Sequence, residues 1–169
     1  MILGVSVSTF VTVHVVISLI AIVAGSIVMF GMLGSNRMPA LTAVFLSLTI
    51  LTSATGFAIP PLVTETFLPS HLFGFLSLGL LAVACFALYG KQLSGSWRWI
   101  YVLTALISLY LNVFVLVAQA FLKVPALKVM APTGSEPPFL IAQLVVLAFF
   151  LYVGARAAMR FRPPTMVVI

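Results

Sequence analysis

The chain has 169 residues, of which 63% are hydrophobic and 6% are charged, and its formal net charge is +6. Soluble globular domains carry about 25% charged residues, so this composition excludes an ordinary soluble domain and places the chain in a lipid bilayer. The eight basic residues lie at the ends of apolar runs and form no basic polar face, which argues against a nucleic-acid partner.

Five segments are long and apolar enough to cross a membrane, which takes about 20 mainly apolar residues. They cover about residues 9–33, 40–60, 71–90, 97–122 and 139–159. The first is longer than the apolar core of a signal peptide and no basic residue precedes it, so we interpret it as a retained span. The sequence therefore predicts an all-α membrane protein, a bundle of five transmembrane helices that forms a single domain over residues 1–169.

The basic residues predict the orientation of the bundle, because Lys and Arg concentrate in cytoplasmic loops. One side of the predicted bundle holds Arg37, Lys91, Arg98, Arg156, Arg160 and Arg162, whereas the other holds only Lys123 and Lys128. This asymmetry predicts an external N-terminus and a cytoplasmic C-terminus, in a bacterial-type inner membrane. Trp97 and Trp99 at the start of the fourth span agree with an aromatic belt on that side.

Four ionisable side chains fall on the predicted external side: His14, Glu65, His71 and Glu136. Such groups are costly in a bilayer and usually face the interior of a bundle. His14 shares a helical stripe with small residues, so we expect it to point inward. His71 is expected in the first turn of the third span, where the helix dipole disfavours imidazolium and favours the neutral form that binds metals.

Each of these side chains also has a plain structural explanation. A histidine at the water interface can bond a neighbouring carbonyl, Glu65 can be a solvated loop residue, and Glu136 can place negative charge at the start of the fifth span. Taken together, His14, His71, Glu65 and Glu136 suit a divalent metal such as zinc, iron or manganese. Two histidines on different helices equally suit a b-type haem, with Lys123 and Lys128 near its propionates.

Polar side chains also follow the fourth and fifth spans at helical spacing: Asn112, Gln119, Lys123 and Gln143. We interpret them either as partners in interhelical hydrogen bonds or as groups that orient a cofactor or a small lipid-soluble ligand such as a quinone. Residues 123–138 contain four prolines and are expected on the membrane surface or folded back over the bundle as a lid.

The sequence thus predicts a small multi-pass membrane protein that binds a metal, a haem or a lipid-soluble ligand at its external face, with a redox role among the functions that fit. Two alternatives stay open: a small-solute transporter, and an accessory subunit that docks onto a second copy or a larger membrane complex. The chain has no HExxH, GxSxG or Walker-type motif, so nothing supports a zincin, a serine hydrolase or an NTPase. No residue is assigned a catalytic role. The only cysteine, Cys85, has no partner for an intrachain disulfide.

Overall fold

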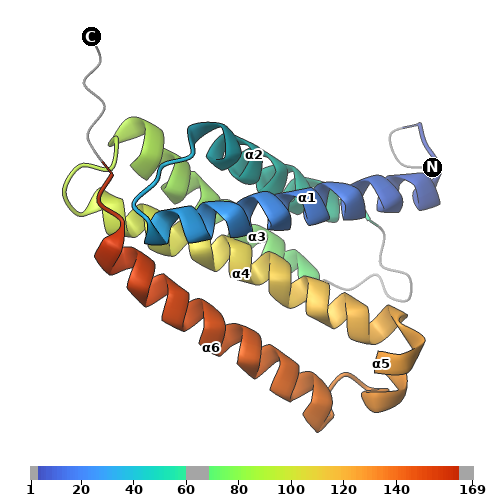
Figure 1. Ribbon diagram of the computed structural model, residues 1–169. Helices are drawn as coiled ribbons and strands as arrows, with labels where there is room; N and C mark the ends of the chain where they lie inside the picture. The colour runs from blue at the N-terminus through green and yellow to red at the C-terminus, as the bar shows by residue number, and fades with distance from the viewer. Residues whose placement is uncertain (1–3, 60–68, 164–169) are drawn as a thin grey trace.

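The computed structural model describes residues 4–59 and 69–163, with side chains from residue 72 onward in the second range. In these ranges the chain folds into helices (Figure 1): α1 Val7–Leu33, α2 Pro39–Gly56, α3 Pro69–Cys85, η1 Phe86–Gly90, α4 Trp97–Lys123, α5 Pro125–Met130 and α6 Pro137–Arg160. Five of the described helices are long and apolar enough to cross a membrane. The predicted all-α architecture with five spans is confirmed.

Serine and proline set where several helices begin. The Oγ atom of Ser6 accepts a hydrogen bond from the Thr9 amide at 3.1 Å and caps the start of α1. The helices α2, α5 and α6 begin at Pro39, Pro125 and Pro137. Proline suits the first turn of a helix because the N–H that it lacks would have no helical partner there.

The third span ends in a π-helical turn, whereas its hydropathy alone predicts an α-helix to the end of the span. After Cys85 the chain continues as the π-helical turn η1, in which the Lys91 amide donates to the carbonyl of Phe86, five residues earlier, at 2.9 Å. Such turns form where an extra residue is accommodated within a helix. The side chain of Lys91 lies over the rings of Phe86 and Trp97, which brings the end of η1 against the start of α4.

The helix α4 occupies the centre of the bundle and packs against α1, α2, α3 and α6, whereas α6 runs along one edge (Figure 1). Close packing between α1, α2 and α4 depends on Gly25. A Cβ atom added there would lie 2.7 Å from the ring of Phe45 and 2.8 Å from Cδ1 of Leu109. Small residues of this kind let helices approach one another in lipid.

Two ends of the bundle differ in chemistry. One end, called the basic end here, collects the α1–α2 loop, the turn before α4 and the residues after α6, and it holds Arg37, Lys91, Arg98, Arg156, Arg160 and Arg162. Two hydrogen bonds join these segments: Arg98 Nη1 donates to the Phe161 carbonyl at 2.6 Å, and the Arg162 amide donates to Ser35 Oγ at 2.7 Å.

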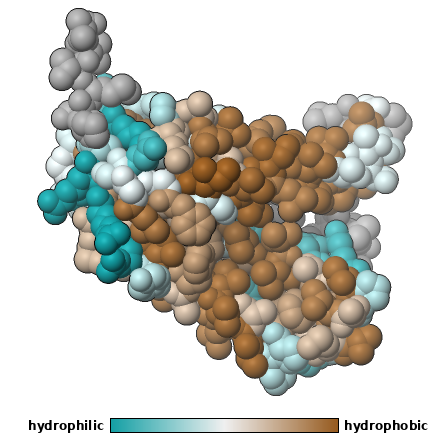
Figure 2. Space-filling model, in the orientation of Figure 1, coloured by the Kyte–Doolittle hydropathy of each residue, from teal (hydrophilic) through white to brown (hydrophobic). Residues whose placement is uncertain are grey.

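The opposite end, called the histidine end, holds His14, the short helix α5 and the start of α6. No residue of α5 is buried, and Figure 1 shows this helix outside the bundle. In Figure 2 the flank of the long helices is hydrophobic, while hydrophilic surface gathers at the basic end. This distribution is that of a protein that exposes its flank to lipid and its ends to water.

Candidate functional site

His14 is half-buried in α1 and faces α2, as its helical stripe predicts. Its Nδ1 atom lies 2.8 Å from Thr55 Oγ1. The Thr55 hydroxyl donates its single proton to the Leu51 carbonyl at 2.7 Å, so it accepts a hydrogen bond from His14 Nδ1–H. In the neutral imidazole this bond leaves the lone pair on Nε2, the nitrogen that can then bind a metal or accept a proton.

The other predicted metal ligands do not join His14 among the described residues. Figure 1 shows the start of α6, which Glu136 directly precedes, well apart from the first turns of α1. Glu65 and the side chain of His71 lie outside the described residues, although the backbone places His71 in the first turn of α3. In the described part of the chain, no three His, Cys, Asp or Glu side chains are arranged to hold a metal ion. A metal or haem site that pairs His14 with His71 stays a prediction.

Glu136 organises the loop between α5 and α6. Its carboxylate accepts hydrogen bonds from the Thr133 amide at 3.0 Å, the Thr133 hydroxyl at 2.9 Å and the Ser135 amide at 3.1 Å. The bond from the Thr133 amide, joined by the other two, lowers the pKa of Glu136 below its usual value. In the structure, the carboxylate of Glu136 therefore stabilises the loop between α5 and α6.

This carboxylate should make the loop sensitive to acid. The pKa of Glu136 is lower in the folded state than in the unfolded state. The ionised carboxylate therefore stabilises the loop fully when the pH is above the pKa of the unfolded state. This stabilisation is lost as the pH falls through the lower pKa of the folded state. We expect the amide NMR signals of Thr133 and Ser135 in micelles to titrate together, with a midpoint below the usual pKa of a glutamate. Glu136→Gln should abolish this titration and Glu65→Gln should leave it unchanged; persistence in Glu136→Gln would contradict the assignment.

The amide side chains on α4 and α6 occupy different environments. Gln143 is buried, and its Nε2 atom donates to the Phe114 carbonyl at 3.0 Å, which joins α6 to α4. Its Oε1 atom and the Nδ2 atom of the half-buried Asn112 are buried without hydrogen-bond partners. Gln119 and Lys123 are exposed near the end of α4. A buried polar atom without a partner costs about 1–3 kcal/mol, and a bound water or ligand often provides the missing bond.

Two hydroxyl groups between α2 and α3 are also buried without partners: Thr52 Oγ1 and Ser77 Oγ. Other buried hydroxyls in this membrane interior bond to their own helix. Thr49 Oγ1 donates to the Phe45 carbonyl at 2.7 Å, and Ser108 Oγ donates to the Thr104 carbonyl at 2.9 Å. Among the described residues, α2, α3, α4 and α6 therefore each contain one buried polar atom without a hydrogen-bond partner.

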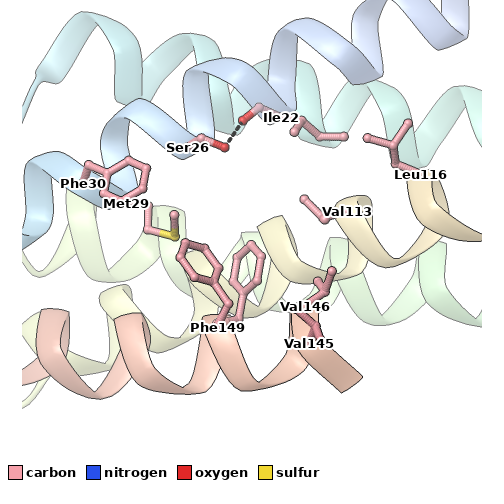
Figure 3. Close-up of a pocket in the computed structure, with 10 residues that line it drawn as sticks. Ile22, Ser26, Met29, Phe30, Val113, Leu116, Val145, Val146 and Phe149 are labelled. Atoms are coloured by element: carbon pink, nitrogen blue, oxygen red, sulfur yellow. Dashed lines mark hydrogen bonds between the residues drawn. The ribbon is translucent and has the colours of Figure 1, made fainter. Parts of the chain in front are cut away.

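An apolar groove lies between α1, α4 and α6 (Figure 3) and has a volume of about 410 Å³. Its lining is Ile22, Ser26, Met29 and Phe30 from α1, Val113 and Leu116 from α4, and Val145, Val146, Phe149 and Phe150 from α6. Ser26 is the only polar side chain in this lining, and its hydroxyl donates to the Ile22 carbonyl at 2.7 Å. The volume falls within the range of about 300–1,000 Å³ that is typical of small-molecule sites.

The groove opens on the flank of the bundle that faces lipid. Phe30, Val145 and Phe149 have exposed fractions of 55%, 63% and 42%, and all three belong to membrane-spanning helices. The rings of Phe30 and Phe149 contact each other across α1 and α6 with centroids 6.5 Å apart. A ligand can therefore reach the groove sideways from the bilayer, with aromatic rings along its wall.

Sequence reasoning did not find this groove. The residues that line it are of the same types as those that face lipid, so hydropathy does not separate the two. No protein-family model, curated protein or solved structure matches the chain. The functional interpretation therefore rests on the geometry of the described residues.

Proposed function

We propose that the protein binds a lipid-soluble ligand in the groove between α1, α4 and α6. One observation carries this proposal: two of the helices that line the apolar groove each hold a buried amide atom, Asn112 Nδ2 on α4 and Gln143 Oε1 on α6, that has no hydrogen-bond partner among the described residues. The surrounding bilayer is the source of the ligand. The predicted orientation, with the basic end on the cytoplasmic side of an inner membrane, is part of the same proposal and is supported by the distribution of Lys and Arg.

The amides lie on the helix faces that form the groove. On α6, Gln143 comes three residues before Val146 and seven before Phe150, so the three share one face. On α4, Asn112 comes four residues before Leu116 and is again on the same face. Val146, Phe150 and Leu116 all line the groove. This spacing supports a site with an apolar body and a polar end one turn further along.

The two unpaired atoms have complementary chemistry. Asn112 Nδ2 is a donor, so a ligand carbonyl would accept a hydrogen bond from it, whereas Gln143 Oε1 is an acceptor and would accept a hydrogen bond from a ligand hydroxyl. Phe149 and Phe150 would contact an aromatic ring of the ligand edge-on or by offset stacking. A quinone and its quinol supply these carbonyl and hydroxyl groups on a ring with an apolar tail. This class of ligand fits the groove better than a metal ion, for which the side chains of the lining offer only the Ser26 hydroxyl and the Met29 thioether.

Filling the groove should weaken binding of the ligand. Val146→Trp places an indole into the space that the ligand would occupy, and we expect at least a roughly tenfold rise in Kd, which corresponds to about 1.4 kcal/mol. The probe is a decyl-substituted benzoquinone, titrated calorimetrically into nanodiscs that carry the protein, with empty nanodiscs subtracted to remove partition into lipid.

The matched control is Leu144→Trp, the same substitution type on the same helix at a side chain that is 62% exposed. It should leave Kd unchanged. Asn112→Leu and Gln143→Leu should weaken binding of the benzoquinone and not of decylbenzene, which has no hydrogen-bonding atom. Equal binding by Val146→Trp and the native protein, or equal weakening in Leu144→Trp, would exclude the groove as the site.

A further inference from the structure

A second pocket lies at the basic end, apart from the residues of the groove. It has a volume of about 420 Å³ and is lined by Gly34, Ser35, Asn36, Arg37 and Pro163. It therefore sits between the α1–α2 loop and the residues that follow α6. The hydrogen bond from the Arg162 amide to Ser35 Oγ holds these two segments together.

Arg37 is half-buried in this pocket, and among the residues that the structure describes its guanidinium has no hydrogen-bond acceptor. The backbone carbonyl of Arg37 accepts from Thr42 Oγ1 at 2.9 Å, but no described residue accepts a hydrogen bond from the side chain. A guanidinium carries five N–H donors in a planar fork, and partial burial of such a cation is costly unless its donors are satisfied. The pocket therefore has space for a ligand that accepts hydrogen bonds from the guanidinium of Arg37.

Two neighbouring side chains present further donors. Asn36 Oδ1 accepts from the Met38 amide at 3.2 Å, which leaves the Nδ2 amide group to donate elsewhere. Ser35 Oγ accepts from the Arg162 amide, which leaves its hydroxyl proton to donate. The backbone amides of residues 34–36 donate to carbonyls of α1. An incoming ligand would consequently meet side-chain donors: one cation, one amide and one hydroxyl.

The charge around the pocket favours an anion. Six of the eight Lys and Arg residues lie at the basic end, and the described glutamate, Glu136, lies at the other end of the bundle. Two of the neighbouring cations are engaged, since Lys91 lies over the rings of Phe86 and Trp97 and Arg98 donates to the Phe161 carbonyl. Arg37 is left without an anionic side chain to pair with among the described residues.

We infer that this pocket binds the phosphate of an anionic phospholipid. It lies where α1 ends and α2 begins, at the depth of the headgroups, and basic pockets between membrane helices are suited to anionic lipid. Arg37 would hold the two non-bridging phosphate oxygens with its fork, and Ser35 and Asn36 would donate further hydrogen bonds to the same two oxygens. The inference goes beyond the proposed function, since the two sites share no residue.

The test measures which lipid stays bound. The protein is reconstituted with equal amounts of phosphatidylglycerol and phosphatidylcholine, and the retained lipid is identified by native mass spectrometry. We expect the native protein to retain phosphatidylglycerol roughly tenfold over phosphatidylcholine, a difference of about 1.4 kcal/mol. Both headgroups carry the phosphate that the Arg37 fork would hold, but the basic end repels the choline cation of phosphatidylcholine. Arg37→Gln should bring this ratio close to one, and Arg37→Lys should lower it severalfold because an ammonium cannot form the fork.

The control is Arg160→Gln, which removes the same charge from an exposed position at the same end and should keep the preference. Equal loss in Arg160→Gln would show diffuse attraction instead of a site. Displacement of phosphatidylglycerol by inorganic phosphate at millimolar concentration would assign the pocket to a soluble anion. Either result overturns the inference. A ratio of retained phosphatidylglycerol to phosphatidylcholine that is unchanged in Arg37→Gln also overturns it. If Arg37→Gln does not fold, the ratio measured for Arg37→Lys is used in its place. Val146→Trp should keep the preference, so this site and the groove can fail separately.

Discussion

Phe161→Ala is expected to lower the free energy of unfolding by about 3–5 kcal/mol, the usual effect of truncating a buried phenylalanine. Phe161 follows the last span, so its burial removes apolar surface from water and not from lipid. Its exposed fraction is 1%, and its ring packs on Tyr101 with centroids 6.0 Å apart. Its carbonyl also accepts the hydrogen bond from Arg98. Unfolding by SDS in mixed micelles, followed by circular dichroism, measures the effect.

The control for this variant is Tyr152→Ala, which truncates an aromatic side chain of α6 that is 66% exposed. We expect a change within about 0.5 kcal/mol, as for substitutions away from packed contacts. If Phe161→Ala unfolds at the same SDS fraction as Tyr152→Ala, the residues after α6 do not contribute to the core at the basic end.

Gly25→Val should be the most damaging change within the membrane. A side chain at this position would overlap the ring of Phe45 and a methyl group of Leu109. The exposed fractions of these two residues are 1% and 0%, so neither side chain has free space into which it can move. Overpacking of this kind costs about 1–3 kcal/mol, and here it acts where α1, α2 and α4 meet. We expect a lower SDS midpoint and weaker protection of α1 amides from hydrogen exchange.

Gly79→Val is the matched control, because an added Cβ atom at Gly79 on α3 meets no atom within 4 Å. It should leave the midpoint within about 0.5 kcal/mol of the native value. A similar loss of stability in both variants would mean that valine disturbs any of these helices, and that the contact at Gly25 has no special weight.

The number and ends of the spans could be predicted from the sequence because they follow from local rules. A run of about 20 apolar residues must be helical in lipid, and prolines such as Pro39 and Pro137 mark helix starts wherever the chain leaves the membrane. The π-helical turn at Phe86–Gly90 was not predictable in this way. It depends on how the end of the third span fits against Trp97, which is a tertiary contact.

The site was harder to predict because topology fixes only which end of the bundle a residue occupies. Placing His14 and Glu136 at one end was sufficient to suggest a joint site, but each has a different partner: His14 on α1 bonds to Thr55 on α2, and Glu136 bonds to Thr133 and Ser135 in its own loop. The prediction that Asn112 and Gln143 face other helices came from helical spacing, and their burial agrees with it. The groove depends on how α6 packs against α1 and α4, and no local pattern encodes that packing.

The hydrogen bond between Ser35 and Arg162 joins residues that are 127 positions apart in the chain. Ribosomes deliver the chain from its N-terminus, so the α1–α2 loop emerges long before the residues that close over it. Until α6 and the residues after it have been made, Ser35 lacks its partner Arg162 and Arg98 lacks its partner Phe161. This end of the bundle therefore closes only after α6 has been made, which couples the packing of the α1–α2 loop to the presence of a helix more than a hundred residues later.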